Sequence, residues 1–148
     1  MLNSQNAPEN IDSKYRSMLI LWFGFLSSII MYLVITLALP RPEGPQNKML
    51  TIVFGAISAF LVGVSFAVKK SFFSQAEEKQ EVRLVNTGFL LAAALCEAGA
   101  LVGLLDLLVA RNNYYFVLII FSFVGLLFHF PKRSQLQLAT YRVRENLA

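Results

Sequence analysis

Four runs of apolar residues, separated by polar and charged segments, dominate the pattern along this chain of 148 residues. The runs cover residues 18–39, 49–68, 84–109 and 114–130. Each is close to the roughly 20 apolar residues that a helix needs to cross the hydrocarbon core of a bilayer. The pattern therefore predicts four transmembrane helices, at about residues 13–39, 47–70, 75–110 and 113–130.

The composition agrees with a membrane protein, because 56% of the residues are hydrophobic and only 15% are charged. We predict an all-α integral membrane protein, an antiparallel bundle of four transmembrane helices within residues 12–131. Residues 1–11 are polar and are expected to form a disordered tail. In residues 132–148, apolar positions recur every three or four residues, which predicts a short amphipathic helix on the membrane surface.

The basic residues are distributed unevenly between the two sides of the predicted bundle. Of the 13 Lys and Arg residues, only Arg41, Lys48 and Arg111 lie on one side, which leaves ten on the other. The positive-inside rule then places both termini and the middle loop in the cytoplasm, in a multi-pass protein of the cell membrane. The net charge of +4 thus reflects topology, and nucleic-acid binding is not expected.

Two polar segments predict where helices begin and end. Ser74-Gln-Ala-Glu77 matches the Ser-x-x-Glu capping box, so the third helix is expected to begin just after Phe72-Phe73. Arg111-Asn112-Asn113 leaves room for only a tight turn, which makes the third and fourth helices antiparallel neighbours.

Small residues form stripes along two of the predicted helices. The second helix carries Gly55, Ala59, Gly63 and Ala67, and the third carries Gly88, Ala92, Cys96, Gly99 and Gly103. Small residues allow helix backbones to approach closely in lipid. The stripes predict contact between the second and third helices, either within one chain or between chains.

Glu97 is an acid near the centre of the third apolar run, and none of the four runs contains Lys or Arg. An ionised carboxylate at the middle of a bilayer is costly unless it is protonated, paired or bound to an ion. Two interpretations remain open: a proton or cation site, or a protonated acid that hydrogen-bonds to a neighbouring helix.

The segment from Phe89 to Leu108, with Glu97 followed by Ala98 and by Gly103 six places on, resembles the carboxylate-bearing helix of the proteolipid c subunit of rotary ATP synthases. The hairpin of residues 49–109 has the orientation of that family. The resemblance implies that Glu97 carries a proton or Na⁺. The loop at residues 69–83 lacks the family's Arg-Gln-Pro signature, and the two outer helices have no counterpart in a two-helix c subunit.

Two further polar residues are candidate secondary sites. Asp106 lies near the outer interface, where an ion pair with Arg111, Arg41 or Lys48 is the favoured interpretation over an ion path. His129, the only histidine, lies at the cytoplasmic end of the fourth helix, where it either anchors the helix end or relays protons. Cys96, the only cysteine, is expected to be a small packing residue.

The sequence contains no pattern typical of an enzyme, a metal centre or a cofactor site. Two functions remain. The first is an accessory or structural subunit that packs into a larger or homo-oligomeric membrane complex, with the bilayer and other subunits as partners. The alternative is a proteolipid-like protein that handles protons or Na⁺ through Glu97.

Overall fold

A computed structural model of the chain describes residues 11–40, 43–79 and 81–138, and the regular secondary structure in this part is all helical. The helices are α1 (Ile11–Ala38), α2 (Lys48–Lys79), α3 (Val82–Leu108), α4 (Phe116–Phe128) and α5 (Arg133–Leu138). Helices α1, α2 and α3 are long and apolar enough to cross a membrane, while α4 is a shorter apolar helix of 13 residues. The prediction of four apolar helices is therefore confirmed, with three long enough to cross a membrane and a shorter fourth.

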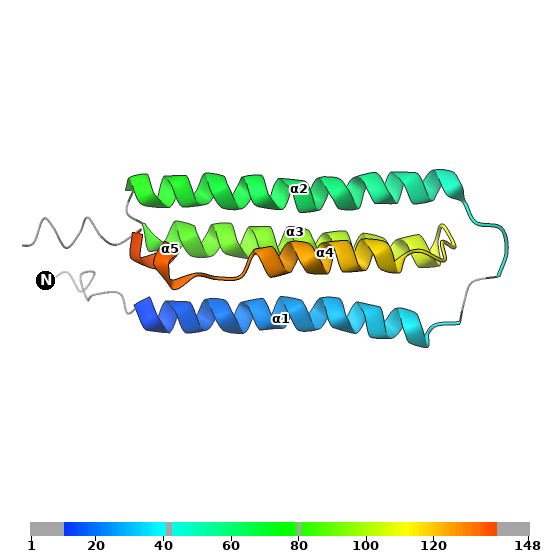
Figure 1. Cartoon of the computed structure of the whole chain (residues 1–148), viewed down its shortest axis with the longest axis horizontal. Helices are drawn as coiled ribbons and strands as arrows, with labels where there is room; N and C mark the ends of the chain where they lie inside the picture. Colours follow the sequence, from blue (N-terminus) through cyan, green and yellow to red (C-terminus); the bar gives the residue numbers. More distant parts are fainter. Residues whose placement is uncertain (1–10, 41–42, 80, 139–148) are drawn as a thin grey trace, which may run out of the picture.

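The four longer helices lie side by side along one axis (Figure 1). The start of α1, the connection between α2 and α3, and α5 lie at one end, which we call the α5 end. The connections from α1 to α2 and from α3 to α4 lie at the other end, which we call the Gly44 end. Consecutive helices are antiparallel, as the short connections predict.

Helix α3 occupies the centre of the bundle and packs against α1, α2 and α4. Its small residues permit this close packing. A Cβ atom added at Gly99 would lie 2.7 Å from Ser122 Oγ, and one added at Gly103 would lie 2.8 Å from the Ile119 side chain. The small-residue face of α3 thus contacts neighbouring helices within the chain.

The small-residue stripe of α2 does not take part in the packing between α2 and α3. Ala59, Gly63 and Ala67 are exposed, and no neighbouring group lies within 4 Å of the Cβ position at Gly55 or Gly63. The buried face carries Ser58, Val62, Ser65 and Ala76 instead. Serine is nearly as small as alanine, so it also allows the helices to approach closely. The buried Ser58 hydroxyl donates a hydrogen bond to the carbonyl oxygen of Gly99 in α3 at 3.2 Å.

The boundary between the second and third helices lies later than the capping box predicts. Helix α2 continues through Ser74 to Lys79, and α3 begins at Val82. Residues 75–79, Gln-Ala-Glu-Glu-Lys, are all good helix formers, so Ser74 does not interrupt the helix. Ala76 is fully buried, and its carbonyl accepts the backbone N–H of Glu81 at 3.2 Å. The helical extension beyond the apolar run therefore belongs to α2 and not to α3.

The helix bounds near the two ends of the chain differ less from the prediction than the boundary between α2 and α3 does. Helix α1 begins at Ile11, inside the predicted tail, while residues 1–10 and 139–148 lie outside the described part of the chain. Helix α5 covers only the start of the predicted amphipathic segment. Its Leu136 is buried, and Arg133 forms an exposed ion pair with Asp12 of α1 at 2.5 Å.

At the Gly44 end, the loop before α2 packs against the turn between α3 and α4. The backbone N–H of Asn47 donates to the carbonyl of Ala110 at 2.9 Å. Gly44 has a φ of 111°, and the guanidinium of Arg111 occupies the space that a Cβ atom at Gly44 would need. This is the one described glycine whose conformation excludes a side chain.

Replacing Gly44 with alanine is expected to destabilise the protein by about 1 kcal/mol, because alanine is strained at positive φ and its methyl group would displace Arg111. The free energy of unfolding in detergent, measured by circular dichroism, checks this expectation. Gly24→Ala is the control, since nothing lies within 4 Å of its Cβ position. Equal stability of the two variants would contradict it.

Candidate functional site

Glu97 lies near the middle of α3, on the side that faces α1, and its side chain is half-buried. The opposing face of α1 presents two hydroxyl groups, Ser28 and Tyr32, which are four residues apart and therefore lie on one side of the helix. An acid from the third helix thus meets a pair of hydroxyls from the first.

The three side chains form a hydrogen-bonded cluster, which we call the Glu97 cluster (Ser28, Tyr32 and Glu97). The Tyr32 hydroxyl donates to Glu97 Oε1 at 2.9 Å, and Ser28 Oγ donates to the same oxygen. Ser28 Oγ also lies 2.9 Å from the Tyr32 hydroxyl. Glu97 Oε2 has no hydrogen-bond partner among the described residues.

This arrangement is better suited to hydrogen bonding than to holding a metal ion. The two hydroxyls supply donors and the carboxyl group supplies an acceptor, so each group has a partner that its chemistry requires. Hard cations such as Ca²⁺ take about 6–8 oxygen ligands, more than these three side chains provide. Within the described ranges, no group of three or more His, Cys, Asp or Glu side chains is placed to hold a metal ion.

A second polar contact holds α1 against the bundle. The indole Nε1 of Trp22 donates to the carbonyl of Leu126 in α4 at 3.1 Å, and this bond is buried. Helix α1 is therefore joined to α3 through the Glu97 cluster and to α4 through Trp22. Glu97 was predicted from the sequence and Tyr32 was not, although two hydroxyl residues four positions apart on an apolar helix are a signal that could have indicated Tyr32.

Asp106 is fully buried near the end of α3, and its partner is an amide and not a basic residue. Asn112 Nδ2 donates to Asp106 Oδ2 at 2.5 Å, while Gln46 Nε2 donates to Asn112 Oδ1 at 2.7 Å. None of the basic side chains in the described ranges forms an ion pair with Asp106, so the predicted pair with Arg111 or Lys48 is wrong; Arg41 lies outside those ranges. Asp106 instead connects the loop before α2 to the turn between α3 and α4.

His129 is fully buried just after α4, inside the bundle and not at its surface. Its Nε2 lies 3.0 Å from Ser65 Oγ, and its ring meets Phe66 edge to face at 4.5 Å. Ser65 Oγ in turn lies 3.5 Å from Cys96 Sγ, so the histidine links polar groups of α2 and α3. Its second ring nitrogen, Nδ1, has no hydrogen-bond partner among the described residues.

The structure does not bring the three predicted polar residues together. Glu97 faces α1, Asp106 lies at the Gly44 end, and His129 lies between α2 and α4 beside Ser65. Of the predicted packing residues, Gly99 and Gly103 are buried against Ser122 and Ile119, whereas Gly55, Ala59 and Gly63 lie away from α3. In the Glu97 cluster, a predicted residue is hydrogen-bonded to two side chains of another helix.

Comparisons with protein-family models, curated proteins and solved structures found no match to this chain.

Proposed function

We propose that this protein is a multi-span membrane protein that serves as an accessory or structural subunit of a larger or homo-oligomeric membrane complex. One observation carries the proposal: the carboxyl group of Glu97 is half-buried near the middle of a membrane-length helix, between α1 and α3. Polar groups at that depth are costly where they face lipid. A helix of another subunit, or of a second copy, that covers this face removes the cost.

The proposed orientation follows the distribution of charge. The α5 end carries most of the basic residues, so the positive-inside rule places it, with both termini, on the cytoplasmic side of the cell membrane. The Gly44 end then faces outward. In this arrangement Glu97 holds α1 to α3 in the membrane interior as a structural hydrogen-bonding group.

A second function, proton handling through Glu97, is favoured by the nature of its partners. Tyr32 and Ser28 can donate to the ionised carboxylate and rearrange when it takes up a proton, and Oε2 is free of hydrogen bonds to described residues. The local resemblance to the c subunit of rotary ATP synthases supports the same alternative. The Glu97 cluster offers only four oxygen atoms, and this small ligand set favours a proton over Na⁺.

A Glu97→Gln substitution in the full-length reconstituted protein separates the two functions. Glutamine keeps an acceptor oxygen for Tyr32 but cannot release a proton, so we expect the oligomeric state and the assembly with partners to persist, with no change in proton flux into vesicles. Glu78→Gln is the control, because Glu78 is an exposed residue near the end of α2. A pH-dependent proton flux that Glu97→Gln alone abolishes would overturn the structural proposal in favour of the alternative.

A further inference from the structure

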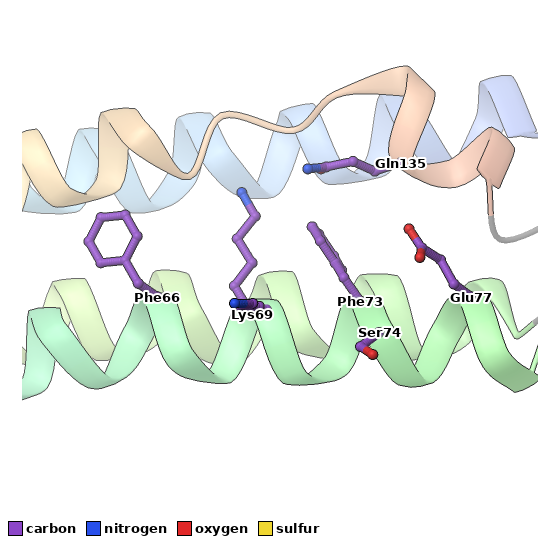
Figure 2. A pocket seen from close by; sticks show the side chains of 7 residues that line it. Phe66, Lys69, Phe73, Ser74, Glu77 and Gln135 are labelled. Atoms are coloured by element: carbon purple, nitrogen blue, oxygen red, sulfur yellow. The ribbon is translucent and has the colours of Figure 1, made fainter.

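A cavity of about 430 Å³ lies at the α5 end, between α2 and the segment that contains α5. It is lined by Phe66, Lys69, Lys70, Phe73 and Glu77 of α2 and by Gln135 of α5, among others. In Figure 2, Lys69 reaches from α2 toward the connection between α4 and α5, with Phe66 and Phe73 on either side of it. The cavity therefore combines a cation and an amide with aromatic walls.

A second hollow of about 210 Å³ lies next to the cavity along the bundle. It is an apolar groove between α2 and α4, lined by Ala59, Gly63 and Phe66 on one side and by Phe121, Val124 and Phe128 on the other. Phe66 lines both spaces, so the polar cavity and the groove are neighbours along α2. The small residues Ala59 and Gly63, which do not pack against α3, create the hollow in the α2 side.

The dimensions of the combined space match those of one bilayer leaflet. Lys69 and Ala59 are ten residues apart on α2, which corresponds to about 15 Å along the helix axis. Half of the hydrocarbon core of a bilayer is also about 15 Å thick. If Lys69 lies at the level of the lipid headgroups, the groove reaches the middle of the membrane.

The charge of the cavity favours an anionic ligand. Lys69 is half-buried above the ring of Phe73, with its Nζ 5.5 Å from the ring centroid, and it forms no ion pair with any described residue. Lys132 lies near enough to repel it electrostatically, and Lys70 adds a third cation. Glu77 is eight residues beyond Lys69, about 12 Å along α2, so it is not a close counter-ion. A phosphate group beside Lys69 would relieve this repulsion.

We propose that the cavity and the groove together bind one anionic phospholipid of the leaflet at the α5 end. The phosphate lies beside Lys69, within reach of the Gln135 amide, and one acyl chain follows the groove past Phe66 toward Ala59. Basic pockets between transmembrane helices at the cytoplasmic side are typical sites for anionic headgroups. The proposal requires that the protein lie in a membrane, but it is independent of the role of Glu97.

The test measures lipid retained by the full-length protein in mild detergent, by native mass spectrometry, with phosphatidylglycerol and phosphatidylcholine supplied in equal amounts. We expect one phosphatidylglycerol per chain, preferred about fivefold, since a single charge contact near the membrane surface contributes about that much. Lys69→Gln is expected to remove this preference. Lys48→Gln, which changes an exposed lysine at the other end of the same helix, is expected to preserve it.

The groove is tested separately with Gly63→Leu, which fills the hollow and meets no group within 4 Å of its Cβ position. We expect this variant to lose bound lipid of either headgroup, whereas Gly24→Leu, at an equally open position on α1, retains it. Circular dichroism of each variant establishes that the helices are intact.

Several results would overturn the proposal. The first is equal retention of the two lipids by the wild-type protein, and the second is unchanged lipid retention in Gly63→Leu. The third is displacement of the lipid by inorganic phosphate, which would make the cavity a site for free phosphate. A site covered by residues 139–148 or by a second copy would retain no lipid in the wild-type protein, which also overturns it. Assembly with other subunits or copies is measured on the same samples. If no lipid binds but assembly is intact, the lipid site is refuted and the proposed function is not.

Discussion

Gly88→Ala is expected to destabilise the bundle by about 1–3 kcal/mol, the usual cost of overpacking a tightly packed core. The Cβ atom of alanine at this position would overlap the Cβ atom of Phe72 in α2 and lie 3.8 Å from its Cα atom. A Cβ atom is fixed to the backbone, so rotation of the phenylalanine ring cannot relieve the overlap. Helices α2 and α3 would have to separate along their shared interface.

The matched control is Gly55→Ala in α2, which is expected to be neutral or to stabilise the helix by about 0.5–1 kcal/mol. No neighbouring group lies within 4 Å of its Cβ position. The free energies of unfolding in detergent, followed by circular dichroism, compare the two variants directly. A Gly88→Ala protein as stable as the wild type would contradict the close approach of α2 and α3.

The same pair of variants also addresses the contact between chains. If Gly55→Ala lowers the oligomeric state without changing the stability of the isolated chain, the α2 stripe packs against another chain. Sedimentation of the detergent complexes measures this. An unchanged oligomeric state would leave the face around Glu97 as the proposed contact surface.

Glu97→Leu is expected to weaken the attachment of α1 by about 1–3 kcal/mol, because it removes the acceptor that Tyr32 and Ser28 share and leaves polar hydroxyls in an apolar environment. Tyr32→Phe should cost less, about 1 kcal/mol, since it removes only one hydrogen bond between helices. Tyr114→Phe, at an exposed position, is the control and should change nothing.

A double-mutant cycle on Glu97 and Tyr32 tests whether the two residues act together. The combined variant is expected to lose less stability than the sum of the two single variants, because the shared hydrogen bond is lost only once. Unfolding free energies in detergent provide the measurement. Strictly additive losses would show that the bond between the Tyr32 hydroxyl and Glu97 Oε1 contributes nothing to stability.

The candidate site was only partly predictable from the sequence. Glu97 could be identified because one acid in a long apolar run is unusual whatever its neighbours are. Its partners could not, because Ser28 and Tyr32 lie 69 and 65 residues away along the chain. The cavity at the α5 end illustrates the same limit, since Lys69 and Gln135 come to line one cavity only when α5 packs against α1 and α3.

The fold, like the site, was predicted from the sequence only in part. The length and composition of the apolar runs determined that the chain forms membrane-length helices, and the small residues of α3 indicated which of its faces packs closely. In lipid, hydrophobicity does not distinguish a buried face from an exposed one, because both are apolar. The buried side of α2, the end of α2 at Lys79 and the contact of α1 with Glu97 were therefore decided by side-chain packing and hydrogen bonding in the tertiary structure.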